Sequence, residues 1–461
     1  MMKDSTVFAS ALPVTAVGCT AFLLGAYYIW NSNQQRRKLF MGTDVDSLLF
    51  HEDDDSVDKK ECIYLDYNGT TPIHPLVLAS MIPYFTTHFG NPSSSHSFGQ
   101  RPKLAVDRAR QSLLCLLGAP TGDNTSIWFT GCGTESDNLA IQLAVQSTPL
   151  VKQKHIVTSN VEHPAIDVCL KALEANGVIH VTYVPVGPDG RVDAQDMIAA
   201  IQPNTILVTL MLANNESGAL QPVKEVAEAC RNRNVLFHTD AAQAAGKVSV
   251  QLADMGHPDM VTLVGHKIGA PKGVAALYVR PDCCNEHGRF LPQKCILLLG
   301  GGQEHGRRGG TENVPYLVGM GKASEVALLE LDRNAKHMEE LRNRLLENLK
   351  RHLGDEQVKA NGPVDPSLRL PNTLSVGIKG VQSSHLLERI GRNVAASAGA
   401  ACHSSGSGGC ISSVLRAMNV PEDLALGTLR LTVGPNTTFE EIDQASAIIA
   451  REAKRQIQTQ S

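Results

Sequence analysis

The chain has 461 residues, enough for about three compact domains. Hydrophobic residues make up 43% of it and charged residues 19%, which excludes wholesale disorder, a collagen-like repeat and a polytopic membrane protein. The formal net charge of −4 leaves no basic excess for a phosphate backbone, so no nucleic-acid partner is expected. The 11 cysteines include no C-x2-C pair, so no metal site is expected and a reducing compartment is favoured.

The first predicted element is an apolar segment of 24 uncharged residues, Val7 to Trp30, which is long enough to cross a bilayer as a helix. Basic residues follow at positions 36–38, and the positive-inside rule then places the rest of the chain in the cytosol. We therefore expect residues 1–38 to be a membrane anchor and the catalytic part to be cytosolic. The alternatives are a cleaved signal peptide or a targeting segment for a mitochondrion or plastid. Residues 39–60, with the run HEDDDSVDKK, are expected to be an acidic linker.

From residue 61 onward, short β-branched runs alternate with amphipathic stretches of helical length, which predicts βαβ units on a mainly parallel sheet. A long helical pattern over residues 314–349 and two later strand-like runs indicate a smaller α+β unit. We expect a large domain over residues 61–320 and a small domain over residues 321–461. The predicted strands are Ser126–Thr130, His155–Ser159, Val178–Val184, Thr205–Leu212, Val235–Thr239, Met260–Val264, Val274–Val279, Thr373–Ile378 and Thr428–Val433.

Polar motifs follow several of these strands directly, at the edge where parallel sheets bind ligands. The run GCGTES (Gly131–Ser136) leads into a predicted helix and is typical of a phosphate cradle, although a glycine turn capped by Thr134 has the same pattern. His163 follows the next strand in VEHPAI, either as a functional group or as a helix cap. The run ANNESG, with Asn215, indicates a polar pocket or a simple turn.

The residues that follow two further predicted strands indicate which chemistry the site supports. Asp240 and Gln243 in HTDAAQ lie about one helical turn apart, and Lys267 in GHKIGAPKG comes 27 positions after Asp240. A lysine between an apolar strand and glycines is open to desolvation, which makes the amine nucleophilic, whereas a solvated loop lysine is the commoner case. A phosphate cradle, a carboxylate and a lysine are together the groups that pyridoxal phosphate requires.

The order of these motifs resembles the class V, fold-type I pyridoxal-phosphate enzymes, and among them the cysteine desulfurases and selenocysteine lyases. The resemblance implies an α/β, fold-type I transferase with a mainly parallel, seven-stranded sheet in its large, cofactor-binding domain and a smaller α+β domain. It covers nearly everything after residue 60. The motifs that carry it are YLDYNGTTP, FGNPSS, FTGCGTESDN, VEHPAI, LANNESG, HTDAAQ, GHKIGAPKG, GGGQEHGRRGGTEN, SAGAACHS and LRLTVGPNTT.

The resemblance also implies roles for the site residues. Lys267 would hold the cofactor covalently, Asp240 would pair with the pyridine nitrogen, and Gln243 would bond the ring hydroxyl. His163 would stack on the ring. The implied phosphate contacts are Gly133, Thr134, His266 and, across the subunit boundary, Thr311. The implied substrate contacts are Asn91, Asn215, which also touches the cofactor, and Arg430, which would grip a carboxylate with two hydrogen bonds.

One position departs from the resemblance. Many relatives carry a serine where this chain has Val264, so one phosphate hydroxyl is missing, and Thr262 is not an obvious substitute.

Cys402 lies in SAGAACHSSGSGGC, residues 397–410, whose composition favours a mobile segment. The resemblance makes it the catalytic nucleophile beside Lys267 and His163: its thiolate would take the substrate's sulfur or selenium and release alanine. Cys410 is either a resolving thiol or a bystander.

We therefore predict a homodimeric cysteine desulfurase that uses pyridoxal 5'-phosphate and L-cysteine and passes the sulfur to an acceptor protein, as in iron–sulfur cluster assembly. The alternatives are a selenocysteine lyase acting on L-selenocysteine, an aminotransferase of the same fold and a catalytically inactive scaffold.

Overall fold

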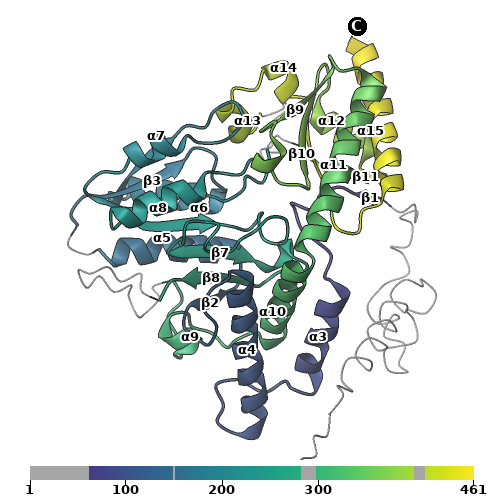
Figure 1. The fold of residues 1–461 in the computed structure, drawn as a ribbon. Coiled ribbons are helices and arrows are strands. Elements are labelled where there is room, and N and C mark those ends of the chain that lie inside the picture. The colour runs from purple at the N-terminus through teal and green to yellow at the C-terminus, as the bar shows by residue number, and fades with distance from the viewer. Residues whose placement is uncertain (1–61, 149–150, 282–296, 399–410, 461) are drawn as a thin grey trace, which may run out of the picture. The chain divides into compact units, whose positions relative to one another are not determined.

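The computed structural model describes residues 62–148, 151–281, 297–398 and 411–460. The chain falls into two units, residues 1–59 and 60–461, and everything below concerns the second. Its largest sheet has seven strands in the order β2-β8-β7-β6-β5-β3-β4 (Figure 1). Six of them run in the same direction, and only β8 is antiparallel to its two neighbours, β2 and β7. These strands are β2 (Ile127–Thr130), β3 (Lys154–Ser159), β4 (Ile179–Val184), β5 (Thr205–Thr209), β6 (Leu236–Asp240), β7 (Met260–Val264) and β8 (Ala275–Val279).

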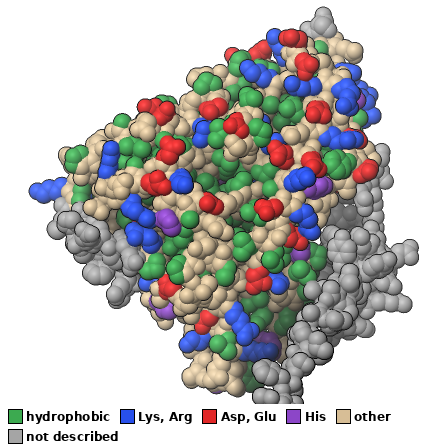
Figure 2. All heavy atoms as spheres, viewed as in Figure 1, with side chains coloured by type: hydrophobic (Ala, Val, Ile, Leu, Met, Phe, Trp, Pro, Cys, Tyr) green, Lys and Arg blue, Asp and Glu red, His purple; other side chains and the backbone are tan. Residues whose placement is uncertain are grey.

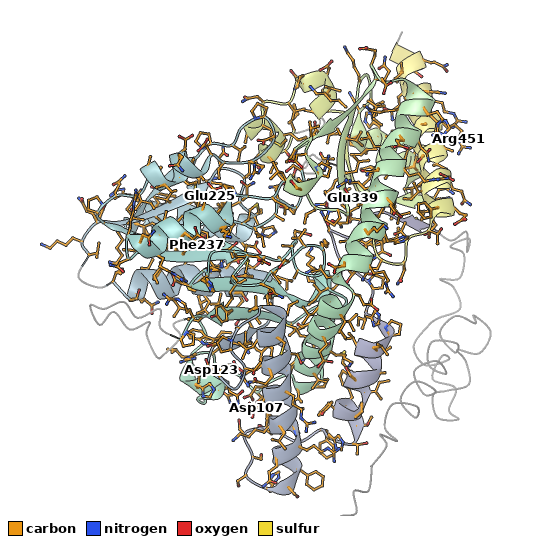
Figure 3. The ribbon with its side chains drawn as sticks, in the orientation of Figure 1. Asp107, Asp123, Glu225, Phe237, Glu339 and Arg451 are labelled. Atoms are coloured by element: carbon orange, nitrogen blue, oxygen red, sulfur yellow. The ribbon has the colours of Figure 1, made fainter. Side chains whose placement is uncertain are left out.

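Helices cover both faces of this sheet because successive strand residues point to opposite sides. Ile156 of β3 packs with α5 and α6, whereas Val157 packs with α4, α8 and α10 on the other face. Phe237 of β6, labelled in Figure 3, is fully buried in that second cluster. The helices around this sheet are α3 (Pro75–Thr86), α4 (Ser97–Leu116), α5 (Gly133–Gln146), α6 (Pro164–Ala175), α7 (Ala194–Ala199), α8 (Val223–Asn232), α9 (Gln303–Gly306) and α10 (Val314–Leu329).

A second, antiparallel sheet has the strand order β12-β13-β10-β9. Apolar residues of α11, α12 and α15 pack on it in one cluster. The parallel pair β1 (Ile63–Tyr64) and β11 (Val394–Ala395) lies beside it. The remaining elements are β9 (Val358–Asn361), β10 (Thr373–Ile378), β12 (Ser397–Ala398), β13 (Thr428–Thr432), α11 (Leu331–Leu353), α12 (Ser383–Ile390), α13 (Ser413–Ala417), α14 (Glu422–Ala425), α15 (Phe439–Gln460) and the 3₁₀ turns η3 (Gly265–Lys267) and η4 (Pro366–Leu368).

The segment that follows β1 joins the two sheets. Tyr67 donates its backbone N–H to Thr432 in β13 (3.3 Å), and Thr71 donates to His266 beyond β7 (3.0 Å). The predicted α/β fold with a mainly parallel seven-stranded sheet is confirmed. The division into domains at residue 320 stays a prediction.

The prediction of a membrane anchor is corrected by the structure. Within the described ranges no helix is both long enough and apolar enough to cross a bilayer. The longest helices, α11 and α15, carry charged residues along their length, because each covers the small sheet with one apolar face only. Residues 7–30 and the acidic run at 39–60 lie outside the described residues. The predicted transmembrane helix, and with it the membrane-anchored, cytosol-facing location, is therefore not supported.

Candidate active site

Three neighbouring strands of the large sheet end at the predicted site. Asn214 to Glu216 lie beyond β5, Asp240 is the last residue of β6, and Lys267 lies in η3 directly after β7. Because β5, β6 and β7 are parallel and adjacent, their carboxyl ends meet at one edge of the sheet. The edge that the sequence predicts as a ligand site therefore carries these residues.

The Lys267 side chain points into this edge. Its Nζ donates to the backbone carbonyls of Asn68 (2.5 Å) and Gly69 (2.8 Å) in the segment after β1. Burial and the neighbouring Arg430 lower the pKa of Lys267 to about 8, against the opposing pull of Asp66 and Asp240. A substantial fraction of the amine is consequently neutral near physiological pH, which is the form that attacks a carbonyl.

Asp240 is buried and accepts one hydrogen bond from the backbone N–H of Ala242 at 2.9 Å. Burial raises its pKa, while that hydrogen bond and the charges of His163 and Lys267 favour the carboxylate.

His163 is the helix cap that one interpretation expects, and its functional role stays a prediction. Its Nδ1 accepts from the Ala165 N–H (3.1 Å), so the ring caps α6, and the neutral ring carries its proton on Nε2. Burial lowers the pKa of His163, and the ring also interacts electrostatically with Asp240 and Lys267. His163 is thus a neutral ring held by its capping bond beside the other two groups.

Two more buried carboxyl groups lie behind Asp240. Burial, followed by the charge of Asp240, raises the pKa of Asp137 well above its usual range. Burial raises the pKa of Glu162 to about 8, although the Ser159 hydroxyl donates to it at 2.5 Å. Several buried carboxylates close together cannot all ionise, and Asp240 is the one that lies beside Lys267. We therefore place the negative charge on Asp240.

The start of α5 lies where the sequence predicts a phosphate cradle. A Cβ added to Gly133 would lie 2.7 Å from Cγ2 of Val264, so only glycine fits at this close approach of helix and strand end. Thr134 follows in the first helical turn, where backbone N–H groups are free to bind an anion. The Thr262 hydroxyl shares a hydrogen bond with Nε2 of the buried His238 (3.0 Å). It therefore does not replace the serine hydroxyl that many relatives carry at the position of Val264.

His266 stands beside the lysine. Its Nδ1 shares a hydrogen bond with the Thr70 hydroxyl (3.1 Å). Burial and three nearby lysines, Lys267 first, lower the pKa of His266 to about 4, so the ring is neutral at physiological pH.

Arg430 comes to this edge from β13 of the small sheet. Its Nη2 pairs with Asp66 at 2.9 Å and also donates to the Ser397 hydroxyl (3.1 Å), and its Nη1 donates to the Asn215 carbonyl (3.3 Å). Its buried Nε has no hydrogen-bond partner within the described part of the chain. The guanidinium is therefore held in place and retains an unused donor for a carboxylate.

Three expected residues are not joined to this site by contacts of the described chain. Asn91 is exposed in the loop between α3 and α4, where its side chain accepts from the Ser93 N–H at 2.8 Å. Thr311 is exposed in the segment between α9 and α10. Cys402 lies outside the described residues, but the residues that flank its segment lie against the site. Ser397 contacts Arg430, and Ser412 hydrogen-bonds the Glu216 side chain.

Two functional positions were missed by sequence reasoning. Asn68, almost fully buried, donates its amide to the Thr373 hydroxyl (2.9 Å) and the Asn215 carbonyl (3.2 Å), which fixes the carbonyl that receives Lys267. Asp66 holds Arg430. Both lie in YLDYNGTTP, the motif quoted for the resemblance without a role, so the signal was present in the sequence.

The donor set fits pyridoxal phosphate. A partly neutral lysine suits its aldehyde, a buried carboxylate suits a protonated ring nitrogen, and a glycine-lined helix start suits its phosphate. The orphaned Nε of Arg430 adds a donor for the carboxylate of an amino acid.

Known proteins share this sequence and fold. The aminotransferase class-V family model matches residues 63–445. A cysteine desulfurase of Trichormus azollae is 41% identical over 396 residues, which cover 85% of this chain and 93% of that protein. The cysteine desulfurase of Mus musculus is 39% identical over 394 residues, covering 85% of this chain and 82% of that protein. A solved NifS-like protein superposes with a TM-score of 0.76 at 32% identity, covering 86% of this chain and 100% of its own.

A second solved structure, DndA from Streptomyces lividans, gives a TM-score of 0.64 at 32% identity over 79% of this chain and 97% of its own. The named relatives do not favour the selenocysteine lyase alternative. The resemblance in the motifs and the α/β fold are thereby confirmed. The chain is an enzyme, and it belongs to the class-V aminotransferase family of pyridoxal-phosphate enzymes, among the cysteine desulfurases.

Proposed function

We propose that this protein is a pyridoxal-phosphate-dependent cysteine desulfurase that takes sulfur from L-cysteine, releases L-alanine and passes the sulfur from Cys402 to an acceptor protein. The observation that carries the proposal is the convergence of Lys267, Asp240 and Arg430 at one sheet edge, with the Lys267 amine partly neutral. The names of the relatives support the same activity.

The proposed cofactor is held by this chain's own groups. Lys267 would bind its aldehyde, Asp240 its ring nitrogen, and Gly133 and Thr134 its phosphate, and His163 would stack on its ring. When bound, pyridoxal phosphate withdraws electrons and so stabilises negative charge on the substrate carbon. Gln243 would donate to the ring hydroxyl, and His266 would add a contact to the phosphate.

Arg430 and Asn215 orient the substrate. The guanidinium would take the substrate carboxylate through Nε, while Asp66 keeps Nη2 and the Asn215 carbonyl keeps Nη1. The Lys267 amine would also move the proton of the substrate carbon, because its lowered pKa keeps the neutral form available.

Cys402 completes the reaction. Its thiolate attacks the substrate sulfur, a sulfur–sulfur bond forms, and the carbon–sulfur bond of the substrate breaks. The electron pair of that bond stays with carbon, a proton completes the methyl group of alanine, and Cys402 keeps the sulfur as a persulfide. The positions of Ser397 and Ser412, which flank the Cys402 segment and contact Arg430 and Glu216, support this role.

Purified protein loaded with pyridoxal phosphate tests the proposal. The wild type is expected to show a visible absorbance band and to form alanine from L-cysteine. Lys267→Ala should lose the band, and Cys402→Ser should keep the band but form no sulfide. A band that survives unchanged in Lys267→Ala, or a wild type that forms no alanine, rejects the proposal.

A further inference from the structure

Lys247 is a buried cation with no role in the reaction as proposed. It follows β6 by seven positions and is 5% exposed. No ion pair formed within the described residues includes it; instead its Nζ donates to two oxygens of Gln243, the backbone carbonyl and Oε1, both at 3.0 Å. A lysine so deeply buried without a carboxylate is uncommon and calls for a reason.

The contact with Lys247 determines how the Gln243 amide lies. An ammonium group only donates, so the amide atom that faces Lys247 is the oxygen. The other end of the amide, Nε2, donates to the backbone carbonyl of Asn68 at 3.1 Å, and a carbonyl only accepts. Both neighbours therefore demand the same orientation, with the NH₂ group toward the site and the oxygen away from it.

The same Asn68 carbonyl links this pair to Lys267. It accepts from Gln243 Nε2 and from Lys267 Nζ, so Lys247, Gln243, Asn68 and Lys267 form one continuous hydrogen-bonded chain. The charges of Lys267 and Arg430 also act on Lys247. Arg430 and the partly protonated Lys247 and Lys267 make this edge of the sheet electropositive, which favours an anionic occupant, such as the ring oxygen or phosphate of the cofactor.

We propose that Lys247 is a positioning residue that fixes the Gln243 amide with its NH₂ group facing the cofactor, so that Gln243 donates a hydrogen bond to the ring oxygen. This inference rests on the proposed function, because it assigns Gln243 to the cofactor. Without Lys247 only the Asn68 carbonyl selects the orientation of the amide, so the donor is held less firmly toward the cofactor.

A double-mutant cycle tests the inference. Lys247→Met, Gln243→Met and the double variant are prepared without cofactor and titrated with pyridoxal phosphate at pH 6.5, where Lys247 is protonated, and the visible band is followed. Lys247→Met should weaken cofactor binding by up to roughly tenfold, the size of the Gln243 hydrogen bond that the ring oxygen would lose. In the Gln243→Met background the same substitution should change the dissociation constant less than about twofold, because Lys247 acts through Gln243.

A second variant separates positioning from folding. Lys247→Gln keeps a donor toward Gln243 and should bind the cofactor more tightly than Lys247→Met, while thermal unfolding of the cofactor-free proteins measures stability separately. Unchanged binding in Lys247→Met, additive losses in the cycle, or no rescue by Lys247→Gln overturns the inference. A wild type that does not bind the cofactor instead rejects the proposed function, so the two failures are distinct.

Discussion

At the scale of single residues, the cost of burying Lys247 should appear in the pH dependence of stability. Burial, with the charges of Lys267 and Arg430, lowers its pKa from 10.5 to about 7. Between these two values the unfolded chain binds one more proton than the folded chain, so the free energy of unfolding should rise with pH from about 7 to 10.5. Below pH 7 both states are protonated, and the full cost of the buried charge remains.

Lys247→Met should flatten this rise in the cofactor-free protein. Thermal midpoints measured at intervals between pH 6.5 and 10 provide the comparison with the wild type. Lys359→Met, at an exposed position on β9, is the matched control and should leave the slope as it is. An equal slope in Lys247→Met and wild type would show that Lys247 is not the group that titrates.

At the scale of elements, the close approach of α5 to the end of β7 predicts the effect of Gly133→Ala. Alanine is the better helix former by about 1 kcal/mol, but its Cβ would lie 2.7 Å from Val264 Cγ2. Overpacking of this kind costs about 1–3 kcal/mol, so we expect net destabilisation and weaker cofactor binding as the cradle shifts.

The double variant Gly133→Ala/Val264→Ala removes the clashing methyl group and serves as the control. It should recover cofactor binding measured by visible absorbance. If Gly133→Ala binds the cofactor as tightly as wild type, the steric argument fails.

The short helix α9 is held to the large sheet by a buried ion pair. Arg110 of α4 pairs with Glu304, and the second oxygen of Glu304 accepts from the Phe129 N–H in β2 at 3.0 Å. Glu304 adopts a left-handed backbone conformation (φ 50°), which the pair helps to maintain. Asp107 and Asp123, labelled in Figure 3, lie on α4 and on the loop after it.

Arg110→Met should destabilise the protein by about 3–5 kcal/mol, because it leaves a buried carboxylate without its cation. Arg110→Met/Glu304→Met should be less destabilised than the sum of the two single variants. Arg344→Met, which breaks the solvent-exposed pair with Asp443, should cost far less. Urea unfolding midpoints provide the measurement, and additivity of the two buried substitutions would contradict the coupling.

The position of a strand could be predicted from the sequence where hydrophobicity alone determines it. The end of a strand was less predictable where tertiary contacts determine it. The run Met260–Val264 is predicted and observed as β7, whereas the strand predicted over Thr205–Leu212 ends at Thr209. The helical pattern over residues 314–349 is two helices, interrupted at Glu330, where α10 leaves α3 and α4 and α11 turns to the small sheet. The periodicity of apolar residues does not reveal that a helix is interrupted where its packing partners change.

The site was predictable where residues follow strands. Asp240 and Lys267 could be found because parallel strand ends share an edge. The roles of Asp66, Asn68 and Lys247 could not be predicted, because these roles depend on contacts between segments far apart in the chain, such as Asp66 with Arg430.

At the scale of the whole molecule, the charge is spread rather than concentrated. Figure 2 shows acidic and basic side chains interspersed over one face of the described chain, with no field of a single sign. Apolar side chains are less evenly placed. Large exposed hydrophobic residues recur on α3, on α4 and on the loop between them, and these are Leu78, Ile82, Phe85, Phe89, Phe98 and Leu104.

We propose that a second copy of the chain covers this surface. Phe89 and Phe98 are 66% and 59% exposed, and their rings lie 5.8 Å apart beside the loop that carries Asn91. Exposed aromatic pairs of this kind are typical of interfaces. The proposal agrees with the homodimer that the motifs imply, in which Thr311 serves the neighbouring site.

Phe98→Glu should therefore dissociate the dimer, since it replaces about 1.5–3 kcal/mol of apolar burial with a charge that must lose water. Light scattering should show twice the chain mass for the wild type and a single chain mass for the variant at micromolar concentration. Val364→Glu, at a residue that is 97% exposed, is the matched control and should stay dimeric. Because Thr311 is expected to act across the interface, Phe98→Glu should also weaken cofactor binding, whereas a dimeric Phe98→Glu would place the interface elsewhere.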